Sequence, residues 1–315
     1  MRIIGTGSAL PEKVVTNEMI SQFLDTSDEW IFPRTGIRQR HVISDEKLED
    51  LGALAAKRAV ESSGLKLSDI DFFICSNVVS EFITPGLSSV ISSILGISCP
   101  CIDINCACPG FIYAMDIAES YYLAGKVKNV LIVCAEEPTR MSSWEDRSTC
   151  VLFGDGAGAV VMTEGNNIKG IKLNSFPDPD KLYQYRKLMH TPYVTKEEEE
   201  VPLQMKGRDV FKFAVTTSDR DIEELLTKNN MTQEDVSYYM IHQANARIID
   251  AIRKYLDVPE EKFPTNIQDH GNSSSASCPI LLDECNRKGL FKKGDNIVFS
   301  AFGAGLLSAA ALIEW

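Results

Sequence analysis

The sequence predicts an α/β fold made of two similar halves, and two observations support this prediction. Runs typical of buried strands alternate with runs typical of helices along most of the 315 residues, which is the pattern of a layered α/β protein. The run FGDGAGAVVM from Phe153 also returns as FGAGLLSAAALI from Phe302, each after an apolar strand pattern, and CACPGF from Cys106 is matched by GNSSSASCPI from Gly271. Because both resemblances occur in the same order, we infer an internal duplication that divides near residue 165.

The composition excludes several classes of protein. With 44% hydrophobic and 24% charged residues, the chain has the balance of an ordinary globular protein. A formal net charge of -12 argues against sequence-independent nucleic-acid binding, which needs a basic face. No apolar run is long enough to span a bilayer and the first residues show no signal-peptide pattern, so we expect a cytoplasmic protein without a nucleic-acid or membrane partner. In a reducing cytosol the nine cysteines are expected to be free thiols, most of them in the core.

The expected elements of the first half follow from caps, breaks and apolar runs. Ser44 is expected to cap a helix that ends at Gly64, whereas the polar segment 28–31 is expected to be a loop. In chain order, the other expected elements are a short helix capped at 16–17, a strand at 70–76, a helix from the Pro-Gly break at 85–86 to about residue 95, a helix at 111–124, a strand at 129–134 and a Gly/Ala-rich turn at 153–159 that leads into a strand.

The second half opens with a polar segment at 178–204, including an acidic run at 197–200, which we interpret as a solvated excursion or flap. A long helix is then expected after Gly207. The remaining expected elements are a strand at 238–242, a helix at 245–255, a loop at 263–275, a helix at 277–287, a strand at 296–300 and a Gly/Ala turn into a last strand at 309–315.

The stretch CIDINCACPGF, which starts at Cys101, reads as a strand, a tight turn and the start of a helix. A cysteine at such a junction meets unpaired backbone N–H groups and the positive end of a helix dipole, which together lower the pKa of a thiol. The pattern therefore predicts an activated cysteine, for which Cys106 and Cys108 are both eligible. Structural zinc is the competing interpretation of the four clustered cysteines, but their pairs have one intervening residue rather than the usual two, so no metal is expected.

Two side chains of the second half can work with such a cysteine. His242 ends a buried strand pattern just before a helix, where open α/β sheets build their sites, although a lone histidine there is more often structural. Asn272 occupies the junction that corresponds to Cys108 in the repeat, although alone it reads as a cap residue. Duplicated positions face each other across a pseudo-twofold axis, so the three form a convergent set. A histidine and an asparagine that donate to one carbonyl oxygen would stabilise a developing enolate.

The segment around Trp30 indicates a further binding function. A tryptophan flanked by Arg34 and Arg38 can stack on a planar ligand such as a nucleotide base while the arginines hold phosphates. The alternative, that Trp30 is a buried packing residue, is equally open from these residues alone.

Six ordered motifs give the chain a resemblance to a known family. They are TSDEWIFPRTGI, DINCACPGF, FGDGAGA, MKGRDVFKFAV, IHQANARI and HGNSSSAS, and they span essentially the whole length. This set resembles β-ketoacyl-acyl-carrier-protein synthase III, a thiolase-fold enzyme that starts type II fatty-acid synthesis. The resemblance implies an α/β, thiolase-like fold, internally duplicated in five αβαβα layers. It places the nucleophilic cysteine in the half 1–165 and the histidine and asparagine in the half 166–315.

The resemblance also implies a role for each matched residue. Cys108 takes an acyl group from acyl-coenzyme A as a thioester, and His242 and Asn272 hold the malonyl thioester carbonyl while carbon dioxide leaves. The backbone N–H groups of Cys108 and Ala304 form the oxyanion hole. The residues implied in binding are Trp30, Arg34 and Arg147 for coenzyme A, and Arg247, extended by Lys206, Arg208, Arg253 and Lys254, for docking of the malonyl-acyl-carrier protein. Acyl-coenzyme A is then a substrate, no cofactor is implied, and the family implies a homodimer.

The sequence departs from the family pattern at three places. The turn Gly303-Ala304-Gly305 replaces a triple glycine and continues with two leucines, Pro109 follows the expected nucleophile, and Thr84 stands where several members have a phenylalanine that shapes the acyl pocket. These departures leave the starter chain open. They also motivate a second hypothesis, a related Cys/His/Asn acyltransferase or condensing enzyme of secondary metabolism with a different acceptor. A non-catalytic thiol- or metal-binding scaffold is a third.

Overall fold

The computed structural model describes residues 1–185, 187–188, 191–193 and 199–315. The elements of the first half are β1 (Arg2–Ala9), β2 (Val14–Thr16), α1 (Asn17–Ser21), α2 (Asp28–Thr35), β3 (Gln39–His41), α3 (Leu48–Ser63), β4 (Phe72–Ser76), α4 (Leu87–Leu95), β5 (Cys101–Ile104), α5 (Gly110–Leu123), β6 (Val130–Glu136) and β7 (Gly156–Thr163). Those of the second half are β8 (Ile168–Ser175), β9 (Leu182–Tyr185), β10 (Val201–Met205), α6 (Gly207–Lys228), β11 (Tyr238–Ile241), α7 (Ala246–Tyr255), α8 (Ile267–His270), α9 (Ser277–Arg287), β12 (Asn296–Gly303) and β13 (Leu307–Glu314).

Two mixed sheets form the framework. The first has the strand order β1-β7-β6-β4-β5, in which β4 runs parallel to β5 and β6, and the second has the order β11-β12-β13-β8, in which β11 runs parallel to β12. The halves share one succession of elements, β1-α3-β4-α4-β5-α5-β6-β7 in the first and β8-α6-β11-α7-α9-β12-β13 in the second, apart from short additions and a strand matching β5, which is not found among the described elements of the second half. The predicted α/β fold with an internal duplication is therefore confirmed.

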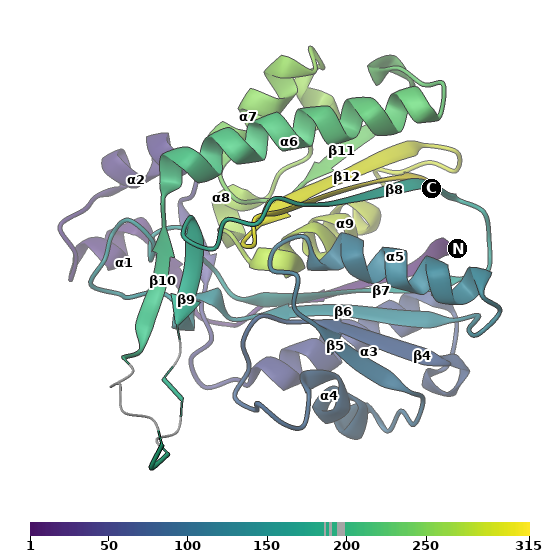
Figure 1. The fold of residues 1–315 in the computed structure, drawn as a ribbon, viewed down its shortest axis with the longest axis horizontal. Coiled ribbons are helices and arrows are strands. Elements are labelled where there is room, and N and C mark those ends of the chain that lie inside the picture. The colour runs from purple at the N-terminus through teal and green to yellow at the C-terminus, as the bar shows by residue number, and fades with distance from the viewer. Residues whose placement is uncertain (186, 189–190, 194–198) are drawn as a thin grey trace.

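The helices and sheets stack in five layers (Figure 1). Helix α3 covers the outer face of the first sheet, and α6 and α7 cover the outer face of the second. Helices α5 and α9 lie between the sheets, where α5 contacts β4 and β6 on one side and β12 and β13 on the other. A continuous apolar cluster of both sheets and both middle helices fills this space. The middle layer thus joins the halves, and the N-terminal ends of its helices carry Cys108 and Asn272.

The segment 28–31 differs from its prediction because it lies in α2. Ser27 caps this helix by accepting a hydrogen bond from the Trp30 N–H, and Gly36 ends it in the left-handed region at φ 76°. The helix has little apolar periodicity and is defined mainly by its two caps, so a search for an apolar face misses it. Trp30 is consequently held on a rigid element.

The predicted start of α3 is also wrong. Lys47 precedes the first helical residue, whereas Ser44 makes hydrogen bonds to Glu46 in the preceding turn. A serine-containing turn and a helix cap share the same local chemistry, which explains the error. The predicted end is confirmed, since Gly64 closes α3 at φ 76°.

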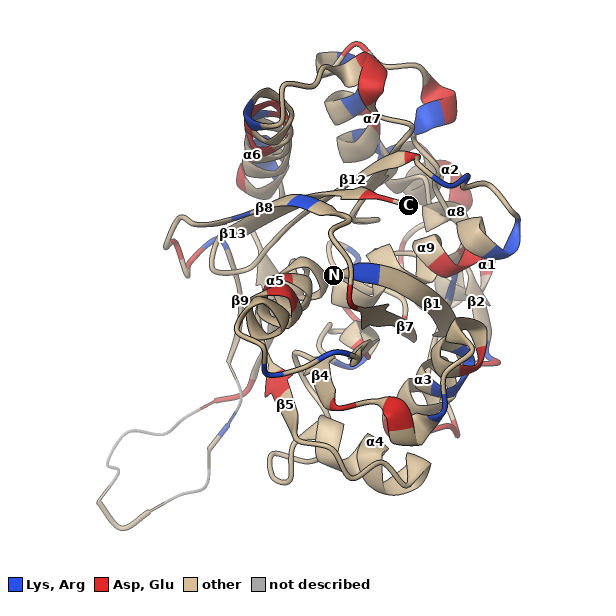
Figure 2. Cartoon of the chain, turned by 90° about the vertical axis from the view of Figure 1, so that its right-hand side faces the viewer, with Lys and Arg blue, Asp and Glu red and all other residues tan. Residues whose placement is uncertain are grey.

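The polar segment 178–204 contains the antiparallel pair β9 and β10. Residues 197 and 198 of the predicted acidic run lie outside the described residues. On α6 and α7, acidic and basic side chains are interspersed (Figure 2). Among the described residues, no helix is both long and apolar enough to cross a membrane.

Strand β1 approaches α3 so closely that glycine is required. A Cβ on Gly7 would lie 2.3 Å from the carbonyl oxygen of Ala55 and 2.5 Å from the backbone nitrogen of Ala59. We expect Gly7→Ala to lower the free energy of unfolding by about 2 kcal/mol, because these backbone atoms cannot rotate aside. Urea denaturation measures the loss. Gly207→Ala, where a Cβ meets nothing within 4 Å, is the control. Equal stability of Gly7→Ala and the wild type would contradict the close approach.

Candidate active site

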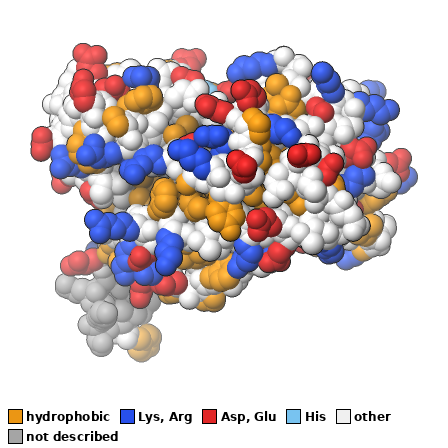
Figure 3. All heavy atoms as spheres, turned by 90° about the horizontal axis from the view of Figure 1, so that it is seen from above, with side chains coloured by type: hydrophobic (Ala, Val, Ile, Leu, Met, Phe, Trp, Pro, Cys, Tyr) orange, Lys and Arg blue, Asp and Glu red, His pale blue; other side chains and the backbone are white. Residues whose placement is uncertain are grey.

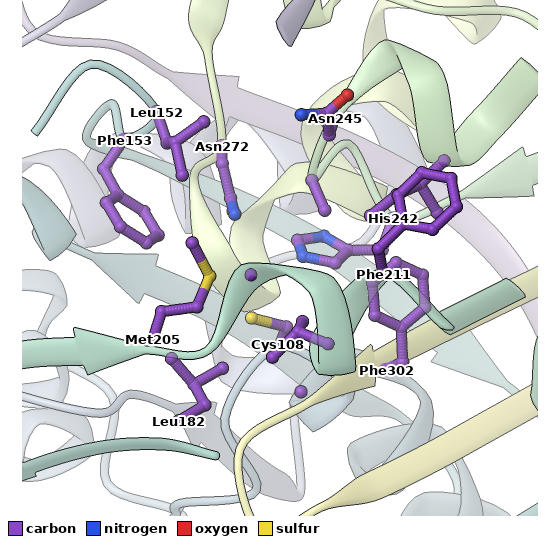
Figure 4. Close-up of a pocket in the computed structure, with 15 residues that line it drawn as sticks. Cys108, Leu152, Phe153, Leu182, Met205, Phe211, His242, Asn245, Asn272 and Phe302 are labelled. Carbon is purple, nitrogen blue, oxygen red and sulfur yellow. The ribbon is translucent and has the colours of Figure 1, made fainter. Parts of the chain in front are cut away.

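A cavity of about 150 Å³ lies where the two halves meet, and side chains from both halves point into it (Figure 4). Its walls are mainly apolar. The lining residues are Cys108, Leu152 and Phe153 from the first half and Leu182, Met205, Gly207, Val210, Phe211, His242, Ala244, Asn245, Ile248, Asn272, Phe302 and Gly303 from the second. The structure therefore brings Cys108, His242 and Asn272 together, although 134 residues separate Cys108 from His242 in the sequence. Cys106 is not among the lining residues.

Cys108 lies in the turn before α5. Ala107 adopts a left-handed conformation at φ 49°, and Pro109, whose missing N–H costs nothing at a helix start, is the N-cap of α5. Desolvation raises the pKa of the Cys108 thiol to about 12, although a hydrogen bond with Ser274, 3.7 Å away, acts in the opposite direction. The prediction of a lowered thiol pKa is thus wrong in direction, because burial outweighs the helix end. The resting nucleophile is a thiol.

His242 follows β11 and is 1% exposed. Its Nδ1 lies 2.6 Å from Ser277 Oγ, which already accepts a hydrogen bond from the Gln243 N–H. Because the Ser277 hydroxyl still has its own proton, it can donate this proton to Nδ1, and in that tautomer the ring proton is on Nε2. Desolvation lowers the pKa of His242 to about 3, so the ring is neutral. A neutral imidazole with a proton on Nε2 can donate a hydrogen bond into the cavity.

Asn272 is fixed by its backbone and its side chain. Its N–H donates to the Leu152 carbonyl oxygen, and its carbonyl oxygen accepts from the Gly154 N–H, which joins it to the first half. Its Oδ1 accepts a hydrogen bond from the Ser274 N–H at 2.9 Å. This bond orients the amide so that Nδ2 faces the cavity (Figure 4). Asn272 and His242 thus present two donors to the same space.

The turn after β12 lies against the cysteine. Gly303 lines the cavity, and a Cβ there would lie 2.9 Å from the Cys108 backbone nitrogen. Ala304, the expected second oxyanion donor, is the next residue and is not among the lining side chains. Ala304, which departs from the family's triple glycine, therefore lies one residue after Gly303, the glycine that packs on the Cys108 backbone.

Trp30, Arg34 and Arg147 gather at one place on the surface. The guanidinium carbons of Arg34 and Arg147 lie 4.8 and 4.9 Å from the centre of the Trp30 ring. Trp30 is half-buried, so part of its side chain packs against the protein and part is exposed to a ligand. Arg147 also binds the Asp25 carbonyl oxygen. The two arginines are exposed and able to meet an anion near an aromatic face.

The predicted docking residues fall into two groups. Arg208 and Arg247 line an open depression of about 480 Å³ that shares Gly207, Phe211 and Asn245 with the first cavity, and Arg34, predicted to bind coenzyme A, lines it as well. Lys206, exposed at the start of α6, belongs to the same end of the molecule. On the face that α6 and α7 occupy, basic side chains are interspersed with acidic ones and apolar patches (Figure 3).

Arg253 and Lys254 form the second group, near the end of α7. Both are paired with Asp250, at 2.8 and 2.7 Å respectively. Their charges are therefore partly compensated within their own helix, whereas no ion pair is recorded among the described residues for Arg208 or Arg247.

Three polar residues near the site were missed by sequence reasoning. Ser274 and Ser277 follow Asn272 and hold Cys108 and His242. Glu136, at the end of β6, is fully buried and accepts hydrogen bonds from Ser274 and Ser275. The sequence signal that could have identified Glu136 is a carboxylate at the end of an apolar strand pattern. In the described part of the chain, no group of three or more His, Cys, Asp or Glu residues is arranged to hold a metal ion.

The lowered pKa of His242 predicts a pH-dependent stability. Between pH 3 and the ordinary value of 6.5, the folded protein binds fewer protons than the unfolded chain at this residue. The contribution of the neutral His242 ring to the free energy of unfolding is therefore complete above pH 6.5 and is lost as the pH falls toward 3. We expect the free energy of unfolding of the wild type to decrease, relative to His242→Ala, by up to about 1.4 kcal/mol per pH unit in this range. Urea titrations at several pH values measure it, and parallel pH dependences would contradict it.

Comparisons with known proteins agree with this geometry. The family model described as 3-oxoacyl-[acyl-carrier-protein] synthase III matches residues 102–176, and the model of its C-terminal part matches residues 226–315. The β-ketoacyl-[acyl-carrier-protein] synthase III of Clostridium perfringens strain SM101 is 43% identical over 99% of this chain and 98% of its own length. That of Xanthomonas campestris pv. campestris is 40% identical over 100% and 98%.

Solved structures agree as well. The 3-oxoacyl-[acyl-carrier-protein] synthase III of Aquifex aeolicus matches with a TM-score of 0.92 at 39% identity, covering 100% of this chain and 99% of that one. The priming β-ketosynthase of the R1128 polyketide pathway matches with a TM-score of 0.92 at 33% identity, covering 99% and 95%. The chain therefore belongs to the 3-oxoacyl-[acyl-carrier-protein] synthase III family and has its thiolase-like fold.

Proposed function

We propose that this chain is the initiating condensing enzyme of type II fatty-acid synthesis. It would join an acyl-coenzyme A starter to malonyl-acyl-carrier protein through a decarboxylative Claisen condensation. The observation that carries this proposal is the meeting of a thiol and two neutral hydrogen-bond donors, Cys108, His242 and Asn272, in one narrow apolar cavity. The names of the related proteins describe the same reaction class.

In the first step, Cys108 Sγ attacks the thioester carbonyl of the acyl-coenzyme A. The negative charge on the carbonyl oxygen is met by the backbone N–H groups of Cys108 and Ala304. The tetrahedral intermediate then releases coenzyme A as its thiol and leaves acyl-Cys108. The turn at Gly303, which packs on the Cys108 backbone, supports an oxyanion hole at this position.

In the second step, malonyl-acyl-carrier protein occupies the cavity. The Nε2–H of His242 and the Nδ2–H of Asn272 donate to the malonyl thioester oxygen, so that the enolate formed as carbon dioxide leaves is stabilised. The enolate carbon attacks the acyl-Cys108 carbonyl, and the Cys108 sulfur leaves. A neutral histidine suits this role, because it donates a hydrogen bond without having to give up a proton.

The two substrates would enter past the arginines at the cavity mouth. Trp30, Arg34 and Arg147 would hold the adenine and the phosphates of coenzyme A, as their ring and guanidinium contacts indicate. Arg247, Lys206 and Arg208 would meet the acidic carrier protein, with Arg253 and Lys254 in a lesser role. Such a local basic surface is compatible with a net charge of -12.

We also propose that the chain forms a homodimer. Strand β5 lies at the edge of the first sheet and offers unpaired backbone groups. Phe82 and Ile83, in the loop between β4 and α4, are 43% and 74% exposed. An open sheet edge and exposed apolar side chains are both features that a second copy would cover.

The proposed reaction predicts a separation of roles between the three residues. Incubation with radiolabelled acetyl-coenzyme A should label Cys108, as located by peptide mapping, and Cys108→Ala should remain unlabelled. His242→Ala and Asn272→Ala should still become labelled but should lose decarboxylation of malonyl-acyl-carrier protein by a factor on the order of 100 or more. Loss of labelling in both variants would contradict this assignment of roles. A wild type that stays unlabelled with acetyl-coenzyme A and with every other short or branched acyl-coenzyme A starter would remove the enzyme proposal altogether.

A second candidate function is a priming or condensing step of secondary metabolism with another acceptor. The similarity to the priming β-ketosynthase of a polyketide pathway and the altered turn at Ala304 favour it. A panel of short and branched acyl-coenzyme A starters with malonyl-acyl-carrier protein distinguishes the two. If Cys108 is acylated but no ketoacyl-carrier protein forms with any starter, the initiating role is wrong and the second candidate stands.

Docking of the carrier protein predicts a charge-reversal effect. Arg247→Glu places a negative charge beside the cavity mouth, so the KM for malonyl-acyl-carrier protein should rise by a factor on the order of five or more, while labelling of Cys108 persists. Lys228→Glu, the same charge change at the exposed far end of α6, is the matched control. Steady-state kinetics measure both variants. Equal KM values for the two would exclude docking at Arg247.

A further inference from the structure

We infer that Ser274 and Glu136 form a proton relay that removes the thiol proton of Cys108 as the sulfur attacks. This inference rests on the proposed function, because it supplies the base for the acylation step. Ser274 contacts the reacting sulfur, whereas Glu136 acts through Ser274 and is a positioning residue. The reaction as described above gives Glu136 no role.

The three groups form a continuous chain of contacts. Ser274 Oγ lies 3.7 Å from Cys108 Sγ and 3.2 Å from Glu136 Oε1. Ser275 Oγ donates to the same Oε1 at 2.6 Å, and the Val78 N–H donates to Oε2 at 3.1 Å. These bonds fix the carboxyl group of Glu136 with one oxygen directed at Ser274.

A serine hydroxyl has one proton, so Ser274 cannot donate to both neighbours at once. An ionised carboxylate is the stronger acceptor, and the Ser274 proton therefore points to Glu136. Ser274 Oγ is placed to donate to Cys108 Sγ, but once its proton has turned to Glu136 a lone pair of its oxygen faces the thiol and can accept the S–H proton. This arrangement directs proton transfer from the Cys108 thiol through the Ser274 hydroxyl to the Glu136 carboxylate.

Glu136 has no cation to compensate its charge. It is 1% exposed, and the ion pairs of the described residues include none to its carboxyl group. The titratable groups that face it are the thiols of Cys75 on β4, Cys134 on β6 and Cys108, and burial raises the pKa of all three. Burial also raises the pKa of Glu136 to about 7. A carboxyl group that is half ionised near neutral pH is suited to accept a proton and to return it.

The proposed step balances. As the S–C bond forms, the Cys108 proton passes to Ser274 Oγ and the Ser274 proton passes to Glu136, so the serine ends unchanged and the carbonyl oxygen carries the negative charge. When the intermediate collapses, the bond to the coenzyme A sulfur breaks. The proton returns along the same path to that sulfur and gives the free thiol of coenzyme A. Glu136 is again ionised for the next cycle.

The competing explanation is electrostatic. A nearby carboxylate that acted only by its charge would oppose a thiolate, so its removal would make Cys108 more reactive. The relay predicts the opposite, because removal of the acceptor leaves the thiol protonated. The sign of the effect of Glu136→Gln therefore separates the two.

The test is the rate of Cys108 alkylation by iodoacetamide, followed by peptide mass mapping of the full chain from about pH 5.5 to 9.5. It needs neither acyl-coenzyme A nor a carrier protein. In the wild type the rate should rise through about pH 7 and then level off. Glu136→Gln and Ser274→Ala should lose that step and react roughly 100-fold more slowly at pH 7.5. Glu136→Asp should restore part of the rate.

Glu137→Gln is the matched control, since Glu137 is also buried but is paired with Arg140. It should keep the wild-type pH profile. Rates of Glu136→Gln and Ser274→Ala that equal or exceed the wild type at pH 7.5 would overturn the relay. Should the relay hold while none of the acyl-coenzyme A starters labels Cys108, the proposed function would be wrong and the relay would stand.

Discussion

The close contact between the N-terminal end of α5, the end of β4 and the segment that leads into α9 is the constraint on which the site depends. At this contact a Cβ on Gly110 would lie 2.0 Å from Ser76 Oγ of β4 and 3.3 Å from the Cβ of Ser275, so a side chain at this position would displace both neighbours. The absence of a side chain lets the junction that carries Cys108 approach the one that carries Asn272. The duplication supplies two helices of the same kind, and their packing between the sheets turns two ordinary junctions into one cavity.

Burial at this contact has one electrostatic consequence for every titratable group there. It raises the pKa of Cys108, lowers the pKa of His242 and raises the pKa of Glu136. Each change favours the neutral form of the group. A site that holds its thiol and its imidazole neutral cannot rely on a preformed thiolate and imidazolium pair. Protons must therefore move during the reaction, along hydrogen bonds that already exist.

The parts of the fold that depend on local signals could be predicted from the sequence. Helix α9 has the predicted bounds, and α4 begins after the Pro-Gly break as expected, because periodicity and turn residues act over a few positions. The thiol pKa could not be predicted, since it depends on side chains packed from other elements. Glu136 and Ser274 are 138 residues apart, and no spacing in the sequence connects them. Local chemistry left Cys106 and Cys108 both eligible, and it did not indicate the buried environment that raises the pKa of the Cys108 thiol.

The unusual turn after β12 shows which positions the chemistry constrains most. Gly303 packs on the backbone of Cys108 and has no room for a side chain, whereas Ala304 accepts a methyl group one residue later. A backbone N–H donor does not depend on the side chain of its residue, so an alanine at 304 keeps that donor. Leu182 and Met205, which belong to β9 and β10, line the cavity instead with large side chains. Part of the shape available to an acyl chain is therefore set by elements other than those that carry the reacting groups.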